Sequence, residues 1–308
     1  MLVETALNMR AHKYKIADIH NERGGYMQIE RARSILEAQR EAMTAEALAL
    51  AFDASANLGK RVVIDAISAT LSSIGNPLEK VCVEDATGCR RTYAVEQELA
   101  LLDNEPDYRY LWATPQSERR NHKSRWLTVA TVDNTTINKA TLFFTLPRDV
   151  TQEFAPHVTL LGYLARAGMV PQYGFGYARE CGCPDYFTVG YAYTYGKRAL
   201  DHSEWIRRAA PINGRADDSL KSPEPLRQAR SLLLDVFPLN VLTDTHLQHR
   251  LGDQSLKEWI LETTGPASLM EIGPRCFAWF VPPARTFSVA TQLRRLGRPM
   301  VAWPERAH

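Results

Sequence analysis

Cys181 and Cys183 are the residues of this chain whose type and spacing come closest to a chemical site, because a single residue separates them. Paired thiols bind zinc or form a redox couple. Zinc sites generally use wider cysteine pairs together with a second pair, and the spacing of Cys82 and Cys89 is unusual for that role. We therefore expect a turn of small residues here. An enzyme with a site near Cys181, Cys183 and His202 is kept as an alternative.

Other patterns that carry chemistry are incomplete. His246 and His249 are three residues apart on an expected helix, whereas metal-binding helices more often use a spacing of four. The run Gly174-Phe175-Gly176 lacks the third glycine and the helix start of a dinucleotide site. The sequence contains no Gly-x-Ser-x-Gly, His-Glu-x-x-His or lysine-bearing phosphate-loop pattern. We therefore expect no metal and no cofactor, assign no catalytic residue, and favour a non-enzymatic protein.

The densest basic run is Arg119–Arg125, which Trp126 follows directly. Arginine, lysine and a neighbouring aromatic ring can contact phosphate and stack on a base, so nucleic-acid binding through Arg119–Arg125 is a second alternative. The formal net charge of the whole chain is only +2, which does not favour a nucleic-acid partner. We expect a solvated loop in this run, with an acidic protein partner as the remaining interpretation.

These residues surround or flank a stretch of alternating aromatic and small residues. Successive side chains of a strand point to opposite faces, so a strand over Tyr173–Arg179 has its rings on one face and its glycines on the other. A second strand over Tyr186–Tyr195 repeats the pattern and pairs with the first. The rings then need a cover, which is either the core of the same chain or a partner. The candidate binding residues are Tyr173, Phe175, Tyr177, Arg179, Tyr191 and Tyr193.

Further strands and helices are expected on both sides of this stretch. Thr141–Leu146 is predicted to be a strand, and Thr151–Ala167 a helix that lies against the glycine side. Other helices are expected over Tyr26–Phe52, Asn57–Ile74, Thr243–Leu251, Leu256–Leu261 and Thr286–Leu296, and hairpins over Lys80–Val95, Trp126–Leu146 and Ser268–Val281. These elements predict an α+β fold in which helices pack on one face of antiparallel sheets.

Two of the later helices have recognisable start signals. Thr243 or Asp244 is the expected cap of the helix over Thr243–Leu251, because short polar side chains accept hydrogen bonds from the first backbone N–H groups of a helix. Asp253 or Ser255 is the expected cap of the next helix.

The bulk composition is that of a globular protein. With 308 residues, of which 45% are hydrophobic and 23% charged, the chain is long enough for two domains. Asn104–Lys123 is the least regular region, and we expect it to divide a mainly helical region over residues 1–123 from an α+β domain over residues 124–308. No signal peptide or membrane span is evident, and five cysteines fit a reducing compartment. We therefore expect a cytoplasmic location and no membrane partner.

Four short segments stand out in the second half of the chain: YGFGYAR at Tyr173–Arg179, YFTVGY at Tyr186–Tyr191, VFPLNVL at Val236–Leu242 and LKEWI at Leu256–Ile260. Together they resemble the later half of certain bacterial toxin-immunity proteins. The resemblance covers about residues 141–303 and does not extend to residues 1–132. It implies an α+β protein that neutralises a toxin by binding it, with no chemistry of its own. It implies no role for any individual residue.

The aromatic strand face and the lack of a catalytic pattern together favour a non-enzymatic protein-binding module. The expected partner is a protein, with a toxin as the leading candidate. Aromatic and arginine side chains are the usual anchors of protein interfaces. This hypothesis requires the rings to lie on the surface of the chain rather than in its core.

Overall fold

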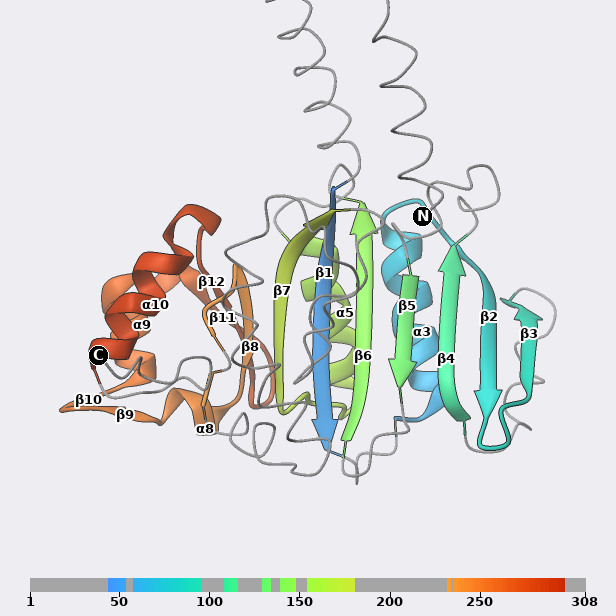
Figure 1. Ribbon diagram of the computed structural model, residues 1–308, viewed down its shortest axis with the longest axis horizontal. Helices are drawn as coiled ribbons and strands as arrows, with labels where there is room; N and C mark the ends of the chain where they lie inside the picture. Colours follow the sequence, from blue (N-terminus) through green and yellow to red (C-terminus); the bar gives the residue numbers. More distant parts are fainter. Residues whose placement is uncertain are drawn as a thin grey trace, which may run out of the picture. The chain divides into compact units, whose positions relative to one another are not determined.

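A ten-stranded antiparallel sheet forms the centre of the fold (Figure 1). The computed structural model describes residues 44–53, 58–95, 108–115, 129–133, 139–147, 154–180, 232–233 and 235–296. All of them belong to one compact unit within residues 44–308. The strand order is β11-β12-β8-β7-β1-β6-β5-β4-β2-β3. The strands are β1 (Thr44–Asp53), β2 (Leu78–Asp85), β3 (Arg90–Ala94), β4 (Tyr108–Pro115), β5 (Val129–Asp133), β6 (Lys139–Pro147), β7 (Tyr173–Glu180), β8 (Leu239–Leu242), β11 (Leu269–Gly273) and β12 (Cys276–Phe280).

One row of directly paired residues crosses this sheet from end to end. Directly paired residues of adjacent strands lie on the same face of a sheet. The row therefore defines one face, called the ring face below, and the alternate positions define the other, called the helix face. From β11 to β3 the row consists of Leu269, Trp279, Asn240, Phe175, Ala49, Phe143, Thr131, Trp112, Cys82 and Thr92.

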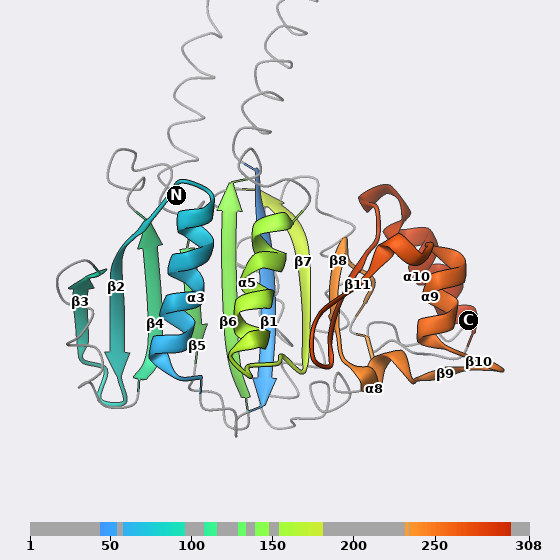
Figure 2. The same ribbon diagram turned by 180° about the vertical axis from the view of Figure 1, so that it is seen from behind.

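The helix face is covered by α3 (Lys60–Ser73) and α5 (Ala155–Arg166), which lie side by side (Figure 2). Each helix has its apolar residues at helical spacing and buries that stripe against the strands. The resulting core combines Ile64, Ile67 and Leu71 of α3, Leu160, Leu161 and Leu164 of α5, and Leu48, Leu50, Val81, Leu111 and Leu142 of the strands.

Two glycines of β7 make the close packing on the helix face possible. A Cβ atom added to Gly176 would lie 2.8 Å from the Phe154 ring, and one added to Gly174 would lie 2.5 Å from Leu50 Cδ2. The places that side chains would take at these positions are therefore already filled. Rings and glycines of β7 occupy opposite faces of the sheet, as the alternation predicts.

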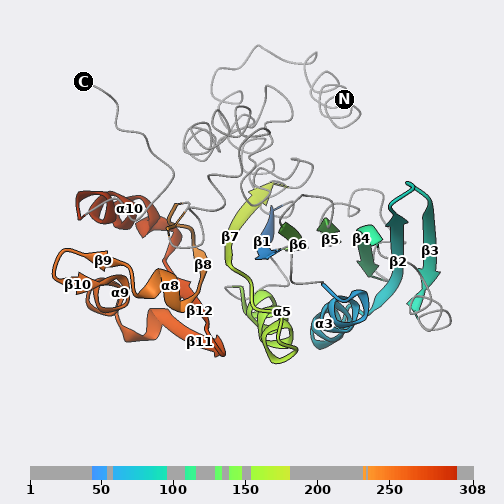
Figure 3. The same ribbon diagram turned by 90° about the horizontal axis from the view of Figure 1, so that it is seen from below.

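At the β7–β11 end, the C-terminal part of the chain covers the ring face. Figure 3 shows its helices grouped at the β8–β12 end of the sheet. The second hydrophobic core joins Phe175 of β7 to Phe237, to Trp259 of one helix and to Leu293 of another. The elements of this part are α8 (Asp244–Leu247), β9 (Arg250–Leu251), β10 (Gln254–Ser255), α9 (Leu256–Thr263), α10 (Thr286–Arg295), and the 3-10 turns Pro266–Ser268 and Pro283–Arg285.

Capping boxes begin α8 and α9. At the start of α9, Ser255 Oγ accepts from the Glu258 backbone N–H at 3.2 Å, and Glu258 Oε2 accepts from the Ser255 backbone N–H at 2.6 Å. Two backbone donors that a helix start leaves without partners are thus satisfied. In α8, His246 Nδ1 accepts from the Thr243 backbone N–H at 3.1 Å. The expected caps Thr243 and Ser255 are confirmed.

Replacing Ser255 by alanine is expected to lower the free energy of unfolding by about 1 kcal/mol, the usual value of a lost N-cap. The substitution leaves the Glu258 backbone N–H without its acceptor at the start of a helix that buries Trp259 and Ile260. Urea denaturation measures the loss. Lys257→Ala, at an exposed position of the same turn, should change the free energy of unfolding by less than about 0.5 kcal/mol. Equal losses in the two variants would contradict the role of the cap.

The predicted α+β fold with antiparallel strands is confirmed, and one detail differs. The two helices α3 and α5 pack on one face as expected, whereas α8, α9 and α10 pack against the ring face at one end of the sheet. Within the described residues, the structure also contains the helices and hairpins expected in Asn57–Ile74, Lys80–Val95, Trp126–Leu146, Thr151–Ala167, Leu256–Leu261, Ser268–Val281 and Thr286–Leu296.

Several local expectations are wrong. The helix predicted to end at Phe52 is replaced by strand β1, the region taken as least regular contains strand β4, and the helix over Thr243–Leu251 is shortened to α8. β4 pairs with β5, so strands on the two sides of residue 123 belong to one sheet. The neighbours of β7 are β1 and β8, and the strand expected over Tyr186–Tyr195 lies outside the described residues.

Candidate functional site

The rings predicted to bind a partner are part of the core. Tyr173, Phe175 and Tyr177 have exposed fractions of 1%, 1% and 2%. Phe175 stacks on Phe237 with ring centroids 4.2 Å apart, and the Tyr173 hydroxyl donates to the Asp235 carbonyl oxygen at 3.5 Å. The cover that the rings require is therefore supplied by the C-terminal part of the same chain. These three rings offer no surface to a partner, and the prediction that they do is corrected.

The remaining predicted residues are placed only by the backbone or not at all. Arg179 lies on β7 and pairs in register with Ala45, and its side chain is outside the described part of the structure. Outside the described residues lie Tyr191, Tyr193, Cys181, Cys183, His202 and Arg119–Arg125.

Figure 1 shows β2, β3 and β4 at the other end of the sheet. The ring face of these strands carries a second group of aromatic and cationic side chains. Glu84, Arg90, Tyr110 and Trp112 form this group, which is called the Arg90–Trp112 cluster. Trp112 belongs to the same row as Phe175, and Glu84 pairs in register with both Arg90 and Tyr110. Tyr110 and Trp112 are half-buried and Arg90 is exposed.

Arg90 contacts both Glu84 and Trp112 of the cluster. Its Nε–H donates to Glu84 Oε2 at 2.5 Å, and its guanidinium carbon lies 5.2 Å from the centroid of the Trp112 ring. The Tyr110 and Trp112 rings stack with centroids 5.5 Å apart. The hydrogen bond to Glu84 raises the pKa of Arg90 above its usual range. A cation over an aromatic face is attracted by the ring.

A tight turn between β2 and β3 sets the register that brings Arg90 opposite Glu84. Asp85 Oδ1 accepts from the Thr87 hydroxyl at 2.6 Å and from the Thr87 and Cys89 backbone N–H groups at 2.8 and 3.0 Å. The Thr87 hydroxyl, followed by these N–H groups, lowers the pKa of Asp85. Gly88 has a φ of 84°, a conformation that favours glycine.

His246 and Cys276, whose side chains could bind a metal or act as a nucleophile, lie away from the Arg90–Trp112 cluster. Within the described ranges, no three His, Cys, Asp or Glu side chains are arranged to hold a metal ion. His246 is buried in its capping box. Burial raises the pKa of the Cys276 thiol to about 12, which keeps it protonated. None of the helices described is both long enough and apolar enough to span a membrane.

Tyr110 and Trp112 were missed at the sequence level, although a signal for them exists. In Tyr110–Ala113 the aromatic residues alternate with Leu111 and Ala113, and Leu111 and Ala113 are fully buried. Alternation of this kind predicts a strand with one buried face. Pro106 and Pro115 on either side, together with the nearby charges, led to the expectation of an irregular region instead.

Comparison with known proteins gives a likeness of fold. No known protein family matches the sequence, and no curated protein sequence matches it. Among solved structures, the Pseudomonas aeruginosa T6SS protein PA0821 matches 84% of this chain and 78% of its own, with a TM-score of 0.50 and 11% sequence identity. At this identity the likeness concerns the fold alone.

Proposed function

We propose that this chain is a non-enzymatic protein-binding module that neutralises a toxin by binding it. The observation that carries the proposal is the Arg90–Trp112 cluster, which presents arginine, tryptophan and tyrosine in a fixed arrangement on a sheet face. These three residue types are the most frequent anchors of protein interfaces. Two further points support a toxin as the partner: the fold likeness to a T6SS protein, and the resemblance of residues 141–303 to toxin-immunity proteins.

The cluster favours a particular mode of binding. Glu84 accepts from the Nε–H of the Arg90 guanidinium. The Nη groups of Arg90 are further donors, and they suit a carbonyl or carboxylate oxygen of the partner. The stacked rings of Tyr110 and Trp112 offer apolar surface beside this charge. A toxin bound here is neutralised because the bound chain sterically blocks the toxin's active surface, without any chemical reaction.

Trp112→Ala is expected to weaken binding of the toxin by roughly 100-fold, the effect of removing a central aromatic anchor, and Arg90→Ala by roughly tenfold. Toxins of the native host are co-expressed with the chain, and growth identifies the one that is neutralised. Titration calorimetry of that toxin with each purified variant then measures the affinity.

The matched control is Arg61→Ala. Arg61 is also an exposed arginine in an ion pair, with Asp65 at 3.1 Å, but it lies on α3 on the helix face. Its replacement should leave affinity unchanged. If Trp112→Ala and Arg90→Ala melt at the wild-type temperature and still bind with wild-type affinity, the cluster is not the interface. If no toxin of the host is neutralised, the proposed function itself is wrong.

A further inference from the structure

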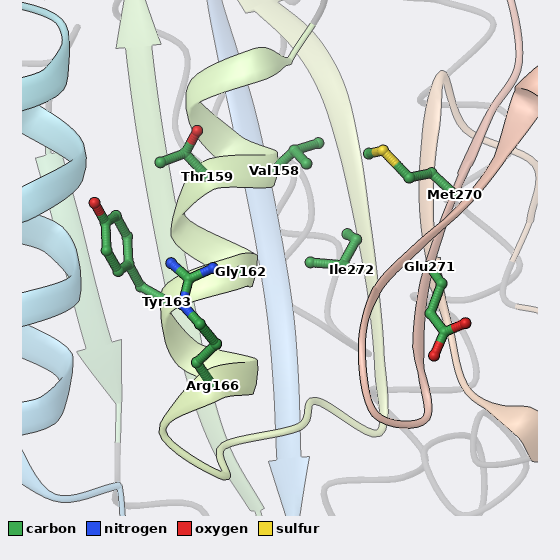
Figure 4. Close-up of a pocket in the computed structure, with 8 residues that line it drawn as sticks. All are labelled: Val158, Thr159, Gly162, Tyr163, Arg166, Met270, Glu271 and Ile272. Atoms are coloured by element: carbon green, nitrogen blue, oxygen red, sulfur yellow. The ribbon is translucent and has the colours of Figure 1, made fainter.

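An open groove lies over α5 and along β11 (Figure 4), with a volume of about 300 Å³. The side chains of Val158, Met270 and Ile272 point into the space between the two elements. The carboxylate of Glu271 points away from that space, whereas the Arg166 guanidinium lies beside Gly162 on the surface of α5. Among the residues that line the groove, the charge that faces it is therefore positive.

Gly162 forms part of the floor of this groove, and the packing of the fold does not require a glycine there. A Cβ atom added to it would meet Arg166 Nη1 at 3.5 Å and Ile272 Cγ2 at 3.8 Å, which are ordinary contacts. Glycine is unfavourable in the middle of a helix, and alanine would be accommodated. A residue that costs stability without a packing reason points to a functional use of the space it leaves open.

The rim of the groove has side chains suited to protein recognition. The Arg166 guanidinium carbon lies 4.8 Å from the centroid of the Tyr163 ring, so the charge is held over an aromatic face. Met270 is 40% exposed, and methionine adapts its shape to apolar partners. Along α5 the lining runs from Val158 to Arg166, a length of about 12 Å at the rise of an α-helix. A groove of that length can hold a short peptide segment of a partner protein.

We propose that this groove is a second protein-binding surface, which takes an apolar segment of another protein that carries a carboxylate. The apolar side chains of the segment lie over Gly162 between Val158 and Met270, and its carboxylate pairs with Arg166. The choice of an acidic segment follows from charge complementarity with Arg166. Because the groove lies on the helix face and the Arg90–Trp112 cluster on the ring face, this surface is independent of the one proposed for the toxin.

Site-specific crosslinking in the native host tests the proposal. A photoreactive benzoylphenylalanine replaces Met270 in the full chain, and the same group replaces Phe287 of α10, which is 49% exposed, as the control position. We expect an adduct at position 270 in roughly tenfold excess over position 287. The crosslinked peptide should come from another protein and contain an Asp or Glu beside apolar residues.

A synthetic copy of that peptide is then titrated against purified variants. Arg166→Glu should weaken binding by roughly tenfold or more, and exchange of the peptide's acid for lysine should restore it. Gly162→Ala should weaken binding by roughly tenfold while the melting temperature stays equal or rises, a combination that a purely structural role would not produce. Trp112→Ala should leave the affinity for the peptide unchanged.

Several results would overturn the proposal. They are an adduct no stronger at position 270 than at 287, an adduct with a second copy of this chain, a crosslinked peptide without an acidic residue, and unchanged affinity in Gly162→Ala. Each of these leaves the toxin-binding proposal intact as long as neutralisation depends on Trp112. Conversely, if no toxin is neutralised but the peptide still binds in the groove, the toxin-binding proposal fails and the groove proposal stands.

Discussion

Replacing Gly174 by alanine is expected to lower the free energy of unfolding by about 3 kcal/mol, at the upper end of the usual range for overpacking. The new Cβ atom would lie 2.5 Å from Leu50 Cδ2, 2.9 Å from the Ala49 carbonyl oxygen and 3.2 Å from Val241 Cβ. Leu50 can turn only within a filled core, and the Ala49 backbone cannot withdraw because β1 pairs with strands on both sides. The strain therefore has no easy outlet.

Equilibrium unfolding in urea measures this loss. Gly59→Ala is the matched control, because a Cβ atom there would meet only Val62 Cγ2 at 3.9 Å. The control should change the free energy of unfolding by less than about 1 kcal/mol. A Gly174→Ala protein with the wild-type midpoint and slope would show that β7 and β1 can separate, contrary to the packing described.

Acidification is expected to destabilise the protein through His157, which has no exposed surface. Burial lowers the pKa of His157 to about 3 from an ordinary value near 6.5. Between these values the unfolded chain binds a proton that the folded chain does not, so stability rises with pH across this window and is complete above 6.5. The slope is about 1.4 kcal/mol per pH unit, and the loss at pH 4.5 is roughly 2–3 kcal/mol.

The surroundings of His157 explain why it stays neutral. Its Nε2 lies 3.2 Å from the Glu46 carbonyl oxygen, and the Phe144 and Phe154 rings meet it edge-on. Among the described residues its Nδ1 has no hydrogen-bond partner, so a second proton on the ring would be buried without an acceptor. The carboxylate of the same Glu46 accepts from the Phe154 backbone N–H at 3.3 Å.

His157→Gln removes the titration and keeps a donor for the Glu46 carbonyl oxygen. The free energies of unfolding of the variant and the wild type are compared by urea denaturation from pH 7 to pH 4.5. We expect the variant to be less stable at pH 7 and to have a shallower pH dependence by about 1.4 kcal/mol per unit. If the free energy of unfolding has the same pH dependence in His157→Gln as in the wild type, His157 is not the source of the acid destabilisation.

The sequence predicts best the elements with a single clear period. β7 alternates rings with small residues, and α5 has an apolar stripe at helical spacing, so both were predicted with nearly the right bounds. β1 was predicted as the end of a helix because Ala47 and Leu50 continue, at helical spacing, the apolar stripe of Tyr26–Phe52. Ala47 to Phe52 are all buried, since the strand is covered on both faces, so no alternation of polar and apolar residues reveals it. The signal that remains is the alternation of alanine at 47, 49 and 51 with Leu48, Leu50 and Phe52.

For the candidate site, the sequence predicts which side chains share a face of the sheet but not which of them are exposed. Alternation identifies which side chains of β7 share a face, but not what covers that face. The cover consists of Phe237, Trp259 and residues of α10, far along the chain from Phe175. The same face is half-exposed at Trp112, where the described cover does not reach. Which end of an aromatic sheet face stays exposed is decided by these long-range contacts.

The central place of β1 in the sheet has a consequence for biosynthesis. β1 is translated before every other described strand, yet its two neighbours, β6 and β7, end only at Pro147 and Glu180. A nascent chain that has not reached Glu180 therefore carries an apolar strand whose backbone amides lack at least one row of partners. The sheet closes late, and the ribosome-bound intermediate is the form of this protein most in need of a chaperone.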